Sequence, residues 1–272
     1  MTFNLKLSLN LLAAGFSLTY LAAPAQAACV SGDCSALGYN KSESACSGDI
    51  IRCPFDTSKV FCKENKIEIG DILYSDMTTS NSVISGKTPI GVVFDGERRR
   101  ALALNEFVKI KWSTENFDIP TLTNYPYYTS KDKAYMNDYD GKSNTKKIID
   151  YCRANSKSCP AAEKAYSYST TGTKAGDWYL PASAEIIAIA NVSGRLNDTL
   201  KKIKGSEVFG ISNGGSSGSI TRYFTYWAST ESEESFAFHT GINDKDYDIE
   251  SKTSDSQTIG GFSNKARPVI AF

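Results

Sequence analysis

The sequence predicts an α+β fold of antiparallel strands with two to four helices, preceded by a small disulfide-rich module. Two nearly continuous apolar runs, residues 90–94 and 101–104, flank Asp95 and Gly96, a pair typical of the turn in a central β-hairpin. Apolar residues at helical spacing follow Pro181, and the seven cysteines lie mostly in the first part of the chain. These three observations carry the prediction.

The N-terminus has the pattern of a secretory signal peptide. Lys6 precedes a mostly apolar run, and a small-residue cleavage site ends at Ala27, so residues 1–27 are expected to be removed. The run is short for a membrane span, which needs ~20 residues, and no second hydrophobic run follows. Lipidation of Cys29 is the alternative fate of the new terminus, but Gln26 stands where a leucine-like residue is typical. We expect a secreted, periplasmic or cell-surface protein with no transmembrane segment after signal cleavage.

The cysteine pattern predicts disulfides rather than a metal site. Cysteines of secreted chains pair with one another, and zinc would need closely spaced thiolates or histidines. This chain has no Cys-x-x-Cys and a single histidine. Residues 28–63 are therefore a cysteine-rich module, either a cap on the main domain or a recognition or assembly tip. The favoured pairs are Cys34–Cys46, Cys53–Cys62 and Cys152–Cys159, which leaves Cys29 as the odd cysteine.

A larger domain is expected over residues 67–272. Its first strands are predicted at residues 69–74, 90–94, 101–104 and 107–112. Asn144 or Thr145 can cap a helix that runs through Tyr151, and Pro160 opens a second helix over 161–168. The expected disulfide at Cys152 would hold the joint between these helices.

A third helix is predicted where an extended aromatic segment meets Pro181. Ser183 is its expected N-cap, and Glu185 adds negative charge to the first turn. The helix is expected to end near residue 192, with one further helical piece at 197–204. Three strands are predicted to close the domain, at residues 222–227, 235–240 and 265–272.

The charge balance and the histidine count argue against several classes of function. The 30 Lys and Arg residues equal the 30 Asp and Glu residues, so no nucleic acid or anionic membrane is expected as a partner. The basic run at 97–100 is expected to be a solvated hairpin tip rather than an anion-binding patch. His239 is the only histidine, and it lies in a predicted strand of alternating apolar and polar residues. The sequence therefore shows no pair of a nucleophile and a base, and no catalytic residue is assigned.

Acidic and aromatic loops supply the remaining candidates. Asp244, Asp246 and Asp248 have a spacing that can feed a calcium ion, but the glycine and final glutamate of an EF-hand are missing, so no cofactor is expected. Tyrosines in the irregular stretch 113–142 offer large rigid faces to a sugar or a protein. The candidate binding residues are Tyr125, Tyr127, Tyr128, Tyr135 and Tyr139.

Three motifs, in order along the chain, resemble a known bacterial family. They are Trp178-Tyr179-Leu180-Pro181 with Glu185, then Trp227-Ala228-Ser229-Thr230-Glu231, then Arg267-Pro268-Val269. The set resembles the Legionella collagen-like protein C-terminal domain family. That family has a Trp-x-Leu-Pro motif that opens a helix, a Trp-Ser-Ser-Thr strand and a closing Arg-Pro-Val strand, and here Ala228 replaces the first serine. The resemblance covers residues 67–272 and leaves the cysteine-rich module outside.

This resemblance implies a C-type-lectin-like fold, in which helices pack against twisted antiparallel sheets and long loops present the binding face. It also implies that the motif residues are structural. We expect Trp178 and Trp227 in the core, and Arg267 paired with a carboxylate such as Glu185 or Glu231. The family includes adhesins that bind sulfated glycans through a basic surface, a feature that this neutral chain does not share.

The function that follows is binding without catalysis. We expect a secreted or surface-exposed protein that serves adhesion, with a glycan or protein ligand on a host or neighbouring cell surface. The tyrosine-rich loop at 113–142 and the glycine-rich loop at 205–220 are the expected binding regions. One alternative is a structural subunit or tip of a bacterial surface appendage, with the cysteine-rich module as its assembly element. A less favoured alternative is an extracellular enzyme.

Overall fold

The chain divides into two compact units, Met1–Lys66 and Ile67–Phe272. The computed structural model describes residues 39–42, 50–53, 56–63, 67–126, 133–209, 225–242, 247–257 and 262–272. In the first unit the described strands form an antiparallel sheet in the order β1-β3-β2. These strands are β1 (Tyr39–Ser42), β2 (Ile50–Cys53) and β3 (Asp56–Lys63).

Most of the first unit lies outside the described residues. This holds for the expected signal peptide at residues 1–27, and for Cys29, Cys34, Cys46 and the side chains of Cys53 and Cys62. The pairings Cys34–Cys46 and Cys53–Cys62 therefore stay predictions.

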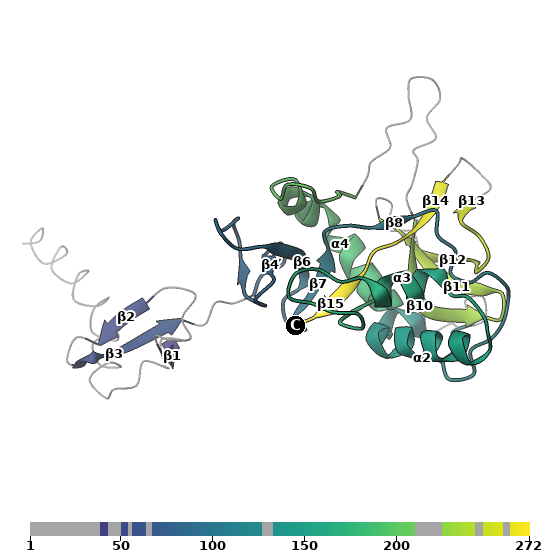
Figure 1. Ribbon diagram of the computed structural model, residues 1–272, viewed down its shortest axis with the longest axis horizontal. Coiled ribbons are helices and arrows are strands. Elements are labelled where there is room, and N and C mark those ends of the chain that lie inside the picture. The colour runs from purple at the N-terminus through teal and green to yellow at the C-terminus, as the bar shows by residue number, and fades with distance from the viewer. Residues whose placement is uncertain are drawn as a thin grey trace, which may run out of the picture. The chain divides into compact units, whose positions relative to one another are not determined.

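The described residues of the second unit form two six-stranded sheets, and the first of them is antiparallel in every described pair. Its order is β5-β4-β6-β7-β15-β9 (Figure 1). The strands are β4 (Ile72–Tyr74), β5 (Thr79–Ser80), β6 (Pro89–Asp95), β7 (Arg100–Ala103), β9 (Trp178–Tyr179) and β15 (Val269–Ala271). The hairpin of β6 and β7 occupies the middle of the sheet and is buried on both faces, which confirms the central hairpin predicted from its apolar arms.

The second sheet has the order β12-β11-β10-β14-β13, and β8 pairs with β14. Its strands are β8 (Phe107–Val108), β10 (Thr225–Glu233), β11 (Phe236–Gly241), β12 (Tyr247–Ser251), β13 (Ser256–Gln257) and β14 (Phe262–Ala266). All described pairs are antiparallel except β10 with β14. The strand predicted at 107–112 is only two residues long, because Lys109 has a positive φ of 53° and interrupts the extended backbone, although the N–H of Ile110 still donates to the carbonyl of Asn264 in β14 at 3.0 Å.

The C-terminal segment supplies strands to both sheets. One strand was expected over residues 265–272, but β14 lies in the second sheet and β15 in the first. Arg267 and Pro268 separate them, and a proline has no N–H to continue a ladder. The yellow run from β14 to β15 in Figure 1 therefore ties the two sheets together.

Three α-helices and one 3₁₀ turn lie in the described part of the second unit. They are the 3₁₀ turn η3 (Ala134–Asn137) and the helices α2 (Gly141–Ala154), α3 (Pro160–Ser167) and α4 (Ser183–Leu200). The Cys152–Cys159 disulfide joins the end of α2 to the start of α3, as predicted. The helix predicted to end near residue 192 continues to Leu200, because Leu196 and Leu200 extend its buried face.

Helix α4 lies at the centre of the main core. It packs against β6 of the first sheet and against β10 and β11 of the second. Helices α2 and α3 build a second core, which holds Trp227, and Trp178 belongs to a third cluster. Both tryptophans are fully buried, which confirms their expected place in the core. Within the described ranges, no helix combines the length and apolar character that a membrane crossing requires.

The architecture is thus α+β with mainly antiparallel sheets, as the sequence predicts.

Candidate functional site

The corner between β9 and α4 is held by one buried carboxylate. Glu185 has no exposed surface, and its Oε2 accepts a hydrogen bond of 2.7 Å from the main-chain N–H of Ala182. Its Oε1 accepts a bond of 2.8 Å from the hydroxyl of Tyr179 and lies 2.6 Å from an Nη1 of Arg100. Burial raises the pKa of Glu185 to about 7, against the lowering effect of Arg100. The carboxylate therefore ties β7, β9 and α4 together.

The start of α4 is capped by neighbours in space rather than by its own serine. The N–H of Ser183 donates to the hydroxyl of Thr230 at 2.8 Å, and the N–H of Ala184 donates to the carbonyl of Asp138 at 3.0 Å. The Ser183 hydroxyl donates to the carbonyl of Tyr135, so the prediction of Ser183 as the N-cap is wrong. Groups from β10 and from the segment before α2 take that role.

Helix α2 starts three residues before the earliest predicted cap. Asn144 and Thr145 lie inside it, buried, and bind other segments instead. The amide of Asn144 donates to Asp138 at 3.0 Å, and the Thr145 hydroxyl accepts from the N–H of Leu180 at 3.0 Å. Both side chains therefore connect α2 to the corner.

Arg267 binds neither Glu185 nor Glu231, so the expected pairing is wrong. Its side chain runs from the joint between β14 and β15 toward the end of β7, where the nearest carboxylate is Glu106 at 3.6 Å. It donates to three main-chain carbonyls, those of Ala103 at 2.9 Å, Leu104 at 3.0 Å and Glu207 at 2.5 Å. Arg267 thus holds backbone at the place where the chain passes between the sheets.

Glu231 pairs instead with Lys252, and neither side chain is exposed. The Lys252 ammonium also donates to the carbonyl of Phe117 at 2.7 Å and to that of Glu234 at 2.9 Å. Burial lowers the pKa of Lys252 and raises the pKa of Glu231, and each partner opposes the shift of the other.

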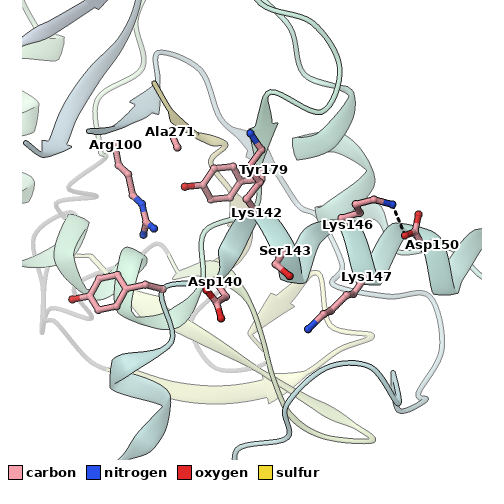
Figure 2. A pocket seen from close by; sticks show the side chains of 10 residues that line it. Arg100, Asp140, Lys142, Ser143, Lys146, Lys147, Asp150, Tyr179 and Ala271 are labelled. Atoms are coloured by element: carbon pink, nitrogen blue, oxygen red, sulfur yellow. Dashed lines mark hydrogen bonds and ion pairs between the residues drawn. The ribbon is translucent and has the colours of Figure 1, made fainter. Parts of the chain in front are cut away.

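A pocket of about 680 Å³ opens beside the corner, at the start of α2. Figure 2 shows Arg100 entering from β7 on one side and lysines projecting from α2 on the other. Among the described residues, four basic side chains and two acidic ones line the pocket, so their net charge is positive within a neutral chain. The lining residues are Arg100, Tyr139, Asp140, Lys142, Ser143, Lys146, Lys147, Asp150, Tyr179 and Ala271.

The charges of this pocket are only partly neutralised from within. Lys146 pairs with Asp150 at 2.6 Å, and Arg100 pairs with Glu185 beneath the pocket. Among the described residues, no ion pair within 4.0 Å engages Lys142 or Lys147. The chemistry offered is therefore the binding of an anionic group.

Of the three candidate tyrosines that the structure describes, one lies at this pocket. Tyr139 lines it, with the guanidinium of Arg98 4.1 Å from its ring centre and that of Arg100 at 5.7 Å. Tyr135 is 5 % exposed and stacks on Phe238, so the expectation that its ring is a surface binding face is wrong.

The described residues show no exposed binding surface built from the other candidate tyrosines. Tyr125 is half-buried against the main core. Tyr127 and Tyr128 lie outside the described residues, as does most of the glycine-rich loop at 205–220.

The calcium prediction stays a prediction. Asp244 and Asp246 lie outside the described residues, whereas Asp248 is on β12. In the part of the chain that the structure describes, no three His, Cys, Asp or Glu residues gather closely enough to hold a metal ion. His239 is 5 % exposed and lies edge-on to the ring of Trp227.

Sequence reasoning missed the basic residues of the pocket. The sequence predicts a solvated tip at 97–100; residues 97–99 are exposed in the β6–β7 turn, as predicted, whereas Arg100 reaches the corner and lines the pocket. The lysines at 142 and 146 have a helical i,i+4 spacing, which becomes informative only when α2 is known to begin at Gly141.

Comparisons with known proteins give a fold and no family. No protein-family model matches the chain, and no curated protein matches it. The fold is similar to that of a fimbrial protein from Bacteroides ovatus whose crystal structure is known, with a TM-score of 0.51 and 16 % sequence identity. The match covers 75 % of this chain and 49 % of the fimbrial protein, so this chain spans about half of that protein's length.

Proposed function

We propose that this chain is a structural subunit of a bacterial surface appendage and that it is not an enzyme. The observation that carries the proposal is the similarity of its fold to a fimbrial protein over three quarters of the chain. The expected secretory signal at residues 1–27 fits the same location.

The most perturbed acid also supports a structural role. Glu185 has no exposed surface, and three donors hold it in place. A catalytic acid with a pKa near 7 would need access to a substrate. The raised pKa of Glu185 therefore belongs to the architecture of the corner.

Immunogold electron microscopy of the bacterium that encodes the chain tests the proposal. Antibodies raised against the purified chain are expected to label filaments along their length or at their tips, and a strain lacking the gene is the control. Label confined to the culture medium or to the periplasm, with filaments unlabelled in the wild type, contradicts the proposal.

Adhesion is the second candidate function, because the pocket beside α2 offers positive charge to a ligand. The ligand would be a glycan or a protein on a host or neighbouring cell. A glycan array probed with the purified chain, with and without calcium, tests the glycan arm. The absence of binding to every glycan, both with and without calcium, would count against a lectin role.

We also propose that residues 67–272 form a C-type-lectin-like domain of the Legionella collagen-like protein C-terminal type. The support is the shared motif set, with Trp178 before a helix and the Arg267–Pro268 joint before the final strand. Superposition on an experimentally solved domain of that family tests the assignment. Strand orders that do not correspond would overturn it.

A further inference from the structure

The pocket beside α2 has positive charge that its own residues leave unneutralised. Lys142 and Lys147 make no ion pair with any described residue, and Arg100 shares one Nη1 with Glu185. No further hydrogen bond of the Arg100 guanidinium joins it to the described part of the chain. The pocket therefore presents two lysines without an ion pair, beside an arginine whose charge is shared with Glu185.

A matching acidic feature lies on the β10–β11 hairpin of the same unit. Glu233 and Glu234 are exposed at the turn between β10 and β11, and neither is ion-paired with a described residue. The buried ammonium of Lys252 binds the carbonyl of Glu234, and the N–H of Lys252 donates to the carbonyl of Ser235 at 3.0 Å. The main chain of the turn is thus held from beneath, so binding would order only the two glutamate side chains.

The aromatic groups of the pocket favour a peptide over a sugar. The ring of Tyr139 lies against the guanidinium of Arg98 at 4.1 Å. Tyr179 is 2 % exposed, and its hydroxyl is bound to Glu185. Tyr179 is thus closed to stacking and Arg98 already lies against the ring of Tyr139, whereas carboxylates pair directly with Arg and Lys.

The two surfaces come from different elements, so a contact between them joins unlike patches of two copies. Repeating a contact of that kind makes an open chain or a ring. The charges of the whole chain balance, so two copies do not repel one another through net charge.

We propose that this pocket receives the acidic β10–β11 turn of a second copy of this chain, joining copies head to tail. The proposal rests on the proposed function, because it supplies a contact between subunits of the appendage. The carboxylates of Glu233 and Glu234 bind Arg100, Lys142 and Lys147 of the next copy.

Charge reversal on each side of the contact tests the proposal. Lys142→Glu with Lys147→Glu reverses the pocket, and Glu233→Lys with Glu234→Lys reverses the turn. Lys202→Glu with Lys204→Glu is the matched control, since it changes charge equally at exposed residues outside the pocket. Self-association of the purified full chain is measured by sedimentation velocity at low and high salt.

The wild type is expected to associate at low salt and to dissociate as salt rises. Each reversal alone weakens association at least tenfold, the control does not, and an equimolar mixture of the two reversed variants associates again. A wild type that stays monomeric at low salt overturns the proposal, as does a mixture that fails to associate. Heparin fragments that bind the pocket while the copies stay apart would also overturn it and identify a polyanionic glycan as the occupant.

Immunogold labelling separates this inference from the proposed function. If the antibody labels filaments of the wild-type strain, and filaments of a strain with the Lys142→Glu, Lys147→Glu variant equally well, the appendage role stands and the head-to-tail contact is wrong. If the antibody labels no filament of the wild-type strain, the appendage role fails whatever the sedimentation result.

Discussion

Gly141→Ala should destabilise the second unit, although glycine to alanine inside a helix is ordinarily stabilising. Gly141 is the first residue of α2, and it lies against the corner between β9 and α4. A Cβ added there would lie 2.7 Å from the main-chain nitrogen of Ala182 and 2.9 Å from Cε2 of Tyr179, and nearer still to Oε2 of Glu185. The backbone cannot yield easily, and the carboxylate is held by three donors, so the new methyl group must displace the corner.

The expected magnitude follows from two opposing effects. Alanine gains up to ~1 kcal/mol over glycine in a helix. Forcing a methyl group into a packed site costs about 1–3 kcal/mol, and the rigid surroundings place this site at the upper end. We expect a net loss of about 2 kcal/mol in the free energy of unfolding. Gly194→Ala is the control, because Gly194 is exposed in α4 with no atom within 4 Å of its added Cβ, and it should gain ~0.5–1 kcal/mol.

Urea unfolding followed by tryptophan fluorescence measures both variants. The signal reports on the second unit alone, because the three tryptophans of the chain lie there and are buried, namely Trp112, Trp178 and Trp227. A Gly141→Ala variant as stable as the wild type, with Gly194→Ala stabilised as expected, would refute the close packing of α2 against the corner.

Three further changes probe the polar framework. The folded pKa of Glu185, about 7, lies above its ordinary value of 4.5, so its contribution to stability is complete below pH 4.5 and is lost as pH rises through 7. Wild type should therefore lose up to about 3 kcal/mol of unfolding free energy from this group over that range, and Glu185→Gln should lack this component in a pH series of urea titrations. Cys152→Ser with Cys159→Ser should cost about 2 kcal/mol, because the bridge closes a short loop across a separation of seven residues, and an unchanged urea midpoint would contradict this. Arg267→Lys should cost about 2–4 kcal/mol, because an ammonium cannot span all three carbonyls that the guanidinium binds, and a midpoint equal to that of the wild type would show that these bonds carry little.

The features that the sequence predicted well depend on residues that are close together along the chain. The β6–β7 hairpin has apolar arms around Asp95 and Gly96, and Cys152 and Cys159 are close along the chain. Pro160 stands at the first position of α3, as its fixed φ favours. Such signals do not depend on what packs against them.

The features it missed depend on distant partners. Arg100 and Glu185 meet across two elements, and nothing near Glu185 along the chain distinguishes Arg100 from Arg267 as its partner. The N-terminal N–H groups of α4 are satisfied by Thr230 and Asp138, so the local rule that favours Ser183 as the cap does not apply. The start of α2 also depends on a distant partner. The sequence favours Asn144 or Thr145 as its cap, whereas the helix begins at Gly141, where the absence of a side chain lets the backbone lie close to the corner.

The corner links stability to the pocket through one residue. Arg100 both neutralises Glu185 and lines the pocket, so a change at Arg100 would alter folding and binding together. Lys142 and Lys147 line the same pocket without an ion pair to the described core, so reversing their charge leaves the corner intact. Any loss of association in the Lys142→Glu, Lys147→Glu variant, with its urea midpoint unchanged, is therefore a loss of pocket charge and not of fold.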